Sequence, residues 1–202
     1  MRIQILLGAL VLGMLPLSQA QAGETTVIAV LGDSLTAGYG VKPEDAFPVQ
    51  LEQKLNADGH PTKVLNYGIS GDTTAGGVTR VRAVIDQHPD WIIIELGTND
   101  MLKGWPPEST KKNLDAILRQ CKQANIKILL TGIKASITLG GEYNDMFAAL
   151  AKQYGVLLYP DFLEKVYGNG GLMQPDGIHP TSEGVAMIVS GIATVYERAT
   201  IK

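Results

Sequence analysis

Five short apolar segments, separated by segments of helical length, are the feature that most limits how this 202-residue chain can fold. We expect them to be strands, at 27–31, 63–67, 91–96, 127–131 and 156–159. Ile92-Ile93-Ile94 and Ile128-Leu129-Leu130 do not alternate with polar residues, which is typical of strands buried on both faces of a parallel sheet. The pattern therefore predicts one α/β domain with a five-stranded, mostly parallel sheet.

The intervening segments carry apolar residues at helical spacing and predict helices at 48–57, 74–87, 109–124, 143–153 and 182–197. Cys121, the single cysteine, ends an i, i+3, i+4, i+7 apolar series that begins at Leu114. We interpret it as a small core residue rather than a nucleophile. Because ligands of such sheets bind beyond the carboxyl ends of the strands, the loops at that edge are where a site is expected.

Residues 1–22 have the pattern of a secretory signal peptide. Arg2 precedes an apolar stretch from Ile3 to Leu17, and Ala20 and Ala22 supply the small residues of a cleavage site. The apolar stretch is shorter than the ~20 residues of a membrane-spanning helix. An uncleaved N-terminal anchor is the alternative. We predict a mature domain at 23–202 that is periplasmic or secreted and has no stable membrane anchor.

The formal net charge of -3 argues against a nucleic-acid partner, because such proteins usually carry a basic face. No run of like charges marks an interaction tail. A monomer is expected.

The first predicted strand ends in Gly32-Asp33-Ser34-Leu35, so Ser34 is expected at the carboxyl edge of the sheet. A serine there can be a nucleophile, provided that a base lies within hydrogen-bond reach. It can equally be the N-cap of a helix, a role that serine favours. Position alone does not separate the two interpretations.

The chain has three histidines, and topology distinguishes them. His60 and His88 precede the second and third predicted strands, so both are interpreted as surface turns at the opposite edge of the sheet. His179 follows the fifth strand and is expected at the same edge as Ser34. Asp176, three residues earlier, can accept the proton of the inner imidazole nitrogen and leave the outer nitrogen to act as a base.

Two further loops at this edge carry hydrogen-bond donors. The N–H of Gly71 and the side-chain amide of Asn99, together with the N–H of Ser34, can bind the negative oxygen that develops during acyl transfer. Taken alone, each loop can also be structural. Asp33 and Asp100 at the same edge, with one histidine, do not make a convincing ligand set, so no metal is expected.

Four blocks in chain order resemble the SGNH hydrolase superfamily, also called GDSL esterases: Gly32-Asp33-Ser34-Leu35, Gly71, Gly97-x-Asn99-Asp100 and Asp176-x-x-His179. They span residues 32 to 180, and the segments 69–73 and 172–174 are similar to the bacterial periplasmic thioesterase I/lysophospholipase L1/arylesterase subgroup. The resemblance implies a three-layer, flavodoxin-like fold and an esterase without a metal or other cofactor. It also implies an acyl ester or lipid as the small-molecule substrate.

The resemblance further implies roles for the matching residues. Ser34 would be the nucleophile and an oxyanion donor, Gly71 and Asn99 the other donors, His179 the base and Asp176 its orienting partner. Two features depart from the subgroup. Thr98 stands where a glycine is common, and the loop at 134–141 lacks a Leu-Pro pair.

The acyl-binding surface is expected from apolar residues near Asn99 and in the loop after the fourth strand, although they can instead cap the core: Met101, Leu102, Trp105, Ile137 and Leu139. Two other functions stay open at this point. One is a carbohydrate acetyl esterase, and the other is a periplasmic binding module without catalysis.

Overall fold

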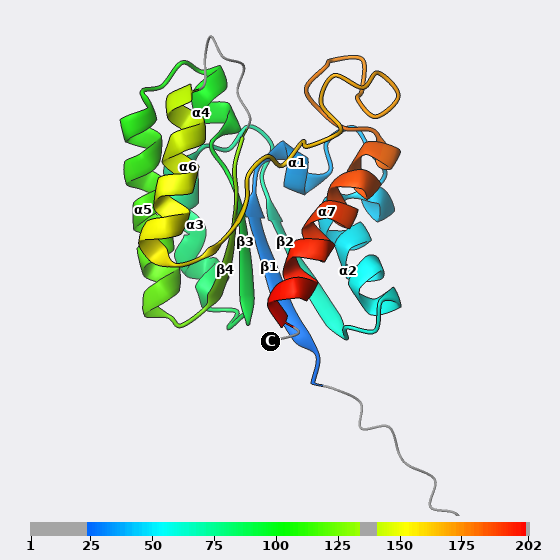
Figure 1. Cartoon of the computed structure of the whole chain (residues 1–202), viewed down its shortest axis with the longest axis horizontal. Coiled ribbons are helices and arrows are strands. Elements are labelled where there is room, and N and C mark those ends of the chain that lie inside the picture. Colours follow the sequence, from blue (N-terminus) through cyan, green and yellow to red (C-terminus); the bar gives the residue numbers. More distant parts are fainter. Residues whose placement is uncertain (1–23, 134–140, 201–202) are drawn as a thin grey trace, which may run out of the picture.

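A sheet of five parallel strands, in the order β2-β1-β3-β4-β5, forms the centre of the molecule (Figure 1). The computed structural model describes residues 24–133 and 141–200. The strands are β1 (Thr26–Gly32), β2 (Thr62–Gly68), β3 (Trp91–Glu95), β4 (Lys127–Thr131) and β5 (Leu157–Tyr159). Every neighbouring pair is parallel, so the predicted mostly parallel sheet is parallel throughout.

Helices cover both faces of the sheet (Figure 1). One layer holds α2 (Phe47–Ala57) and α7 (Ser182–Thr200), and the other holds α3 (Thr74–Ile85), α5 (Pro107–Gln123) and α6 (Gly141–Tyr154). The predicted three-layer, flavodoxin-like architecture is confirmed. The predicted helices differ from these bounds by three residues at most.

The core lies in two clusters of buried side chains, one between the sheet and each helical layer. Along β1, Ile28 and Val30 pack toward α2 and α7, whereas Ala29 and Leu31 pack toward α3 and α5. Burial on both faces explains why the central strands are continuously apolar. Cys121 is fully buried in the second cluster, as its helical spacing predicts.

Three short elements were not expected from the sequence. They are α1 (Ser34–Ala37), a 3-10 turn at Pro43–Asp45 and α4 (Thr98–Leu102). Each is too short to show helical periodicity. The helices α1 and α4 begin just beyond the carboxyl ends of β1 and β3, and they therefore determine how the residues at this edge are presented.

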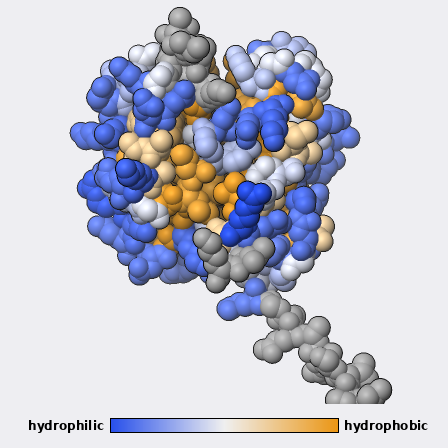
Figure 2. Space-filling model, viewed as in Figure 1, coloured by the Kyte–Doolittle hydropathy of each residue, from blue (hydrophilic) through white to orange (hydrophobic). Residues whose placement is uncertain are grey.

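The strand β5 is short and forms one edge of the sheet, with Leu157 and Leu158 half-buried. Figure 2 shows apolar side chains gathered in the middle of the face shown, between polar helical surfaces. The predicted signal peptide, 1–22, falls outside the described residues and stays a prediction. No helix within 24–133 and 141–200 combines the length and the apolar character needed to cross a membrane.

Candidate active site

Ser34 is the first residue of α1, and a single residue, Asp33, separates it from the end of β1. The N-cap of this helix is Asp33, whose Oδ1 accepts a hydrogen bond from the Leu35 N–H at 2.9 Å. The alternative interpretation of Ser34 as the cap is therefore not what the structure shows. Capping by the preceding residue leaves the serine hydroxyl available for other contacts.

The structure brings Ser34 together with His179, 145 residues further along the chain, and with Asp176. The hydroxyl of Ser34 is 2.9 Å from Nε2 of His179. Nδ1 of His179 is 2.6 Å from Oδ2 of Asp176. With the proton on Nδ1, Nε2 is left as the acceptor for the serine O–H, which is the tautomer that a general base requires.

The local backbone holds Asp176 in its ionised form. Its Oδ1 accepts hydrogen bonds from the N–H of His179 at 3.0 Å and from the N–H of Ile178 at 2.9 Å. The backbone and side-chain hydrogen bonds from His179, followed by that from Ile178, lower the pKa of Asp176 to about 2. The carboxylate therefore stays charged, and stays an acceptor for the imidazole, at any pH near neutrality.

The loop that carries His179 is attached to the rest of the edge through Gln174. Its side-chain Nε2 donates to the carbonyl oxygens of Tyr39, at 2.9 Å, and Pro180, at 2.8 Å. An isolated antiparallel bridge between Met173 and Pro180 closes the base of the loop. The imidazole is therefore positioned by the segment beside α1 as well as by its own loop.

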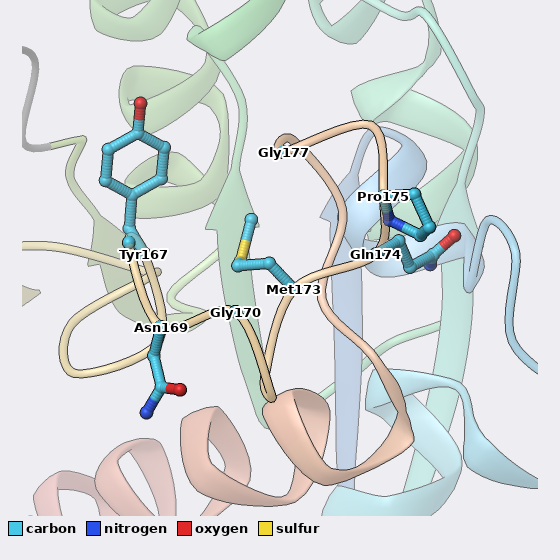
Figure 3. Close-up of a pocket in the computed structure, with 8 residues that line it drawn as sticks. Tyr167, Asn169, Gly170, Met173, Gln174, Pro175 and Gly177 are labelled. Atoms are coloured by element: carbon cyan, nitrogen blue, oxygen red, sulfur yellow. The ribbon is translucent and has the colours of Figure 1, made fainter.

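A hollow of about 440 Å³ lies on one side of this loop (Figure 3). Figure 3 shows Gln174 and Pro175 along one wall and Tyr167 and Asn169 on the opposite segment, with Met173 between them. Neither Ser34, Gly71 nor Asn99 lines it. The hollow therefore adjoins the loop without containing the reacting groups.

The other two histidines lie away from this edge, as the topology predicts. His60 sits in the turn before β2, where its ring meets Tyr196 edge-on at a centroid distance of 6.4 Å. His88 lies in the turn before β3 with a positive φ of 51°. Neither belongs to the group around Ser34.

Gly71 lies in the exposed loop between β2 and α3 and has a φ of 79°. This left-handed conformation favours glycine, so the residue type is explained by the turn itself. The carbonyl of Gly71 accepts a hydrogen bond from Nζ of Lys103 at 3.3 Å. Arg80 supports the same loop, because it pairs with Asp72 at 2.7 Å and donates to the carbonyl of Gly32 at 2.8 Å.

Asn99 is the second residue of α4, and its Nδ2 donates to Oδ2 of Asp33 at 2.9 Å. The amide nitrogen is therefore directed to the residue immediately before Ser34. The neighbouring Asp100 is fully buried and accepts from the N–H of Thr74 at 2.9 Å. This bond ties α4 to the start of α3, directly after the loop that carries Gly71.

The expected acyl-binding residues have different surroundings. Met101 is half-buried and packs against the core between the sheet and α5. Leu102 and Trp105 are exposed, by 57% and 37%. Ile137 and Leu139 lie outside the described residues, as does most of the 134–141 loop. Among residues 24–133 and 141–200, no group of three or more His, Cys, Asp or Glu is arranged to hold a metal ion.

Sequence reasoning missed Glu95, the last residue of β3. Its side chain is 2% exposed, and its Oε2 accepts hydrogen bonds from Oγ1 of Thr36 at 2.8 Å and from the N–H of Asp33 at 3.2 Å. When a polar residue ends an apolar strand, the sequence does not indicate whether its side chain points into the protein or into solvent. The only available signal was Gly32, which lies beside Glu95 in the sheet.

Comparison with known families identifies the family of the chain. The model of the GDSL-like lipase/acylhydrolase family matches residues 30–187, which include Ser34, Gly71, Asn99, Asp176 and His179. The chain belongs to this family. The resemblance seen in the sequence is thereby confirmed, and the GDSL family member described here is an enzyme, a carboxylic ester hydrolase.

Three esterases and thioesterases are similar to this GDSL family member over most of its length. It is 39% identical to thioesterase 1/protease 1/lysophospholipase L1 of Escherichia coli (strain K12), with 86% of this chain and 84% of the relative covered. It is 38% identical to an arylesterase of Vibrio mimicus, with 86% and 88% covered. The crystal structure of AlinE4, an SGNH-hydrolase family esterase, superimposes with a TM-score of 0.73 at 39% identity, covering 89% of this chain and 98% of AlinE4.

Proposed function

We propose that this protein hydrolyses acyl esters, and acyl thioesters where they are available, by transferring the acyl group to Ser34 and then to water. The observation that carries the proposal is the continuous contact from the Ser34 hydroxyl through the His179 imidazole to the Asp176 carboxylate. A serine hydroxyl is a weak nucleophile by itself, and a base that is itself oriented by a third group is what activates it.

In the first step, Nε2 of His179 takes the proton of the Ser34 hydroxyl while Oγ forms a bond to the carbonyl carbon of the ester. The carbonyl oxygen becomes negative and accepts hydrogen bonds from the N–H groups of Ser34 and Gly71 and from the amide of Asn99. The bond to the leaving alcohol or thiol then breaks, and His179 returns the proton to it. The product of this step is an ester on Ser34.

In the second step, water loses a proton to His179 and attacks the carbonyl carbon of the acyl-enzyme. The same donors hold the negative oxygen. Collapse of the intermediate breaks the bond to Oγ of Ser34, which regains its proton from His179, and the carboxylic acid departs. Donors held in place before the reaction are worth about 10² to 10³ each in turnover, because no reorganisation is needed as the charge develops.

The substrate class is proposed from the relatives and from the surface beside the site. The E. coli relative is named a thioesterase and lysophospholipase and the Vibrio relative an arylesterase. Leu102 and Trp105 present exposed apolar side chains on the segment that follows Asn99. If the predicted signal peptide directs the mature domain to the periplasm or outside the cell, lysophospholipids and external esters are accessible there, whereas acyl-CoA is cytoplasmic.

The test is hydrolysis of p-nitrophenyl esters from C2 to C16 by the mature protein, with Ser34→Ala as the matched variant. We expect hydrolysis by the wild type, loss of at least 10³-fold in the variant and an optimum above C2. An optimum at C2 would point to an acetyl esterase instead. A folded wild type that hydrolyses none of these esters and does not react with an organophosphonate probe would overturn the serine mechanism and favour a binding module.

A further inference from the structure

Beneath the proposed oxyanion hole lies a pair of buried carboxyl groups that the mechanism above does not use. The side chains of Asp33 and Glu95 are 1% and 2% exposed. Asp33 directly follows β1, and Glu95 is the last residue of β3, the strand beside it. Neither carboxyl group forms a salt bridge with a basic side chain among the described residues. Arg80, which donates to the neighbouring Gly32 carbonyl, pairs with Asp72 instead.

Two carboxyl groups in one buried site cannot both ionise at low cost, so they share a proton. Burial, followed by the charge of Asp33, raises the pKa of Glu95 well above its usual range. Burial also raises the pKa of Asp33, to about 6, although the hydrogen bonds from Leu35 and Glu95 oppose this. Near neutral pH the pair therefore consists of a neutral Glu95, with a proton to donate toward Asp33, and an Asp33 carboxylate. The backbone N–H of Asp33 joins the two residues as well, since it donates to Oε2 of Glu95 at 3.2 Å.

The Asp33 carboxylate is the group that orients Asn99. An ionised carboxylate can only accept hydrogen bonds, so it selects the nitrogen end of the amide over the oxygen end. One N–H of Asn99 points to Asp33, at 2.9 Å between Nδ2 and Oδ2, and the second N–H stays available for a substrate oxygen. A protonated or neutral group at Asp33 would allow the amide to turn over and present its oxygen instead.

Gly32 explains how Glu95 reaches this place. A Cβ atom on Gly32 would lie 2.7 Å from Oε2 of Glu95 and 1.9 Å from Oγ1 of Thr36. The space that a side chain would fill is taken by the hydrogen bond between Thr36 and Glu95. The glycine before Asp33 is therefore required by the buried Thr36–Glu95 contact.

We propose that Glu95 is a positioning residue of the oxyanion hole: its buried carboxyl group hydrogen-bonds Asp33 and keeps the Asp33 carboxylate against the amide nitrogen of Asn99. This rests on the proposed function, in which Asn99 is an oxyanion donor. Glu95 itself touches no reacting atom. Its effect on the reaction is transmitted entirely through Asp33 and Asn99.

The test measures kcat and KM for Glu95→Gln and Glu95→Met with the p-nitrophenyl ester that the wild type hydrolyses fastest. Each variant is made in two backgrounds, one with Asn99 intact and one with Asn99→Ala. Glutamine keeps a donor for Asp33 and an acceptor for Thr36, so kcat is expected to stay within about threefold of wild type. Methionine has similar length without these groups, and we expect kcat to fall about tenfold at unchanged KM, as for a lost hydrogen bond to a charged group. In the Asn99→Ala background the same change should cost less than twofold.

An equal loss from Glu95→Met in both backgrounds would overturn the proposal, and so would a Glu95→Gln variant as slow as Glu95→Met. Thr131→Val is the matched control. It removes a buried hydrogen bond at the same edge of the sheet, from Thr131 to the Ile94 carbonyl, and should lower stability while kcat is unchanged.

A second variant tests the same path if Glu95→Met does not fold. Asp33→Asn keeps the acceptor for the Leu35 N–H but places its own amide nitrogen opposite the amide nitrogen of Asn99. Because two donors cannot bond to each other, the Asn99 amide is expected to turn over and kcat to fall about 10²-fold. This cost should vanish in the Asn99→Ala background, and a cost that persists there would overturn the proposal. A loss below fivefold for Asn99→Ala alone would instead contradict the oxyanion role of Asn99 in the proposed function.

Discussion

The ring of Tyr39 lies against the imidazole of His179, with the centroids 4.5 Å apart and the ring planes inclined by 36°. Tyr39 follows α1, the helix that begins with Ser34, whereas His179 lies on the loop before α7. The contact therefore joins the segment of the proposed nucleophile to the segment of its proposed base. Each time His179 takes a proton in the proposed reaction, an imidazolium forms beside an aromatic face, which is a favourable arrangement.

Replacing Tyr39 tests the contribution of this face. We expect Tyr39→Leu to lower kcat about three- to tenfold, because the imidazolium loses the ring, and Tyr39→Phe to stay within twofold of wild type. Steady-state hydrolysis of a p-nitrophenyl ester measures both. A Tyr39→Phe variant as slow as Tyr39→Leu would show that the hydroxyl group, and not the ring, is what the reaction needs.

Asn99→Ala removes one proposed oxyanion donor. Turnover is expected to fall by roughly 10² to 10³, since the donor acts on charge that exists only in the transition state and intermediate. KM should change little, whereas the thermal unfolding midpoint should fall by a few degrees, because the substitution also removes the hydrogen bond that Asn99 donates to the buried Asp33 carboxylate.

The buried Asp33 should make stability depend on pH. Its pKa in the folded state is raised from 3.8 to about 6, mainly by burial, with Glu95, His179 and Asp72 as the charged or titratable groups that act on it. A raised pKa means that the folded state binds the proton more tightly than the unfolded state. This contribution to stability is complete below about pH 4 and is lost as the pH rises through 6.

Urea unfolding at pH 4 and pH 7 measures this effect. From pH 4 to pH 7 the unfolding free energy of the wild type should fall by roughly 2 kcal/mol more than that of Asp33→Asn, as the size of the pKa shift implies. No shift would mean that Asp33 does not carry the titration.

Cys121 gives an independent test of the core. Burial raises the pKa of its thiol to about 12, so the thiolate that reacts with disulfide reagents is scarce as well as inaccessible. We expect no reaction with Ellman's reagent in the native protein and one equivalent per chain after denaturation. Rapid reaction of the folded protein would contradict the packing of α5 against the sheet.

Much of the architecture follows from the sequence alone because the signals are long and periodic. The apolar runs of β1, β3 and β4 predict strands that are buried on both faces, and the amphipathic segments predict the helices that cover the sheet. The rule that sites form at the carboxyl ends of parallel strands then distinguishes His179 from His60 and His88.

The remaining features depend on contacts that no local pattern records. Glu95 ends an apolar strand, where a solvent-exposed carboxylate would look the same in the sequence, and the missing side chain of Gly32 leaves the space for it to turn inward. The ring contact of Tyr39 with His179 spans most of the chain. The helix α4 has five residues and no periodicity to detect, yet it determines where Asn99 points.

The His179 loop is attached through the Gln174 hydrogen bonds and the Met173–Pro180 bridge. Activity can therefore be lost before the protein as a whole unfolds. Ser34 follows a central strand with partners on both sides, so it should keep its place until the whole sheet unfolds. The base is held by a few hydrogen bonds on the surface and can leave in a local opening. Low denaturant should therefore stop hydrolysis reversibly while the circular dichroism of the helices is still native, which would make turnover a reporter of loop docking.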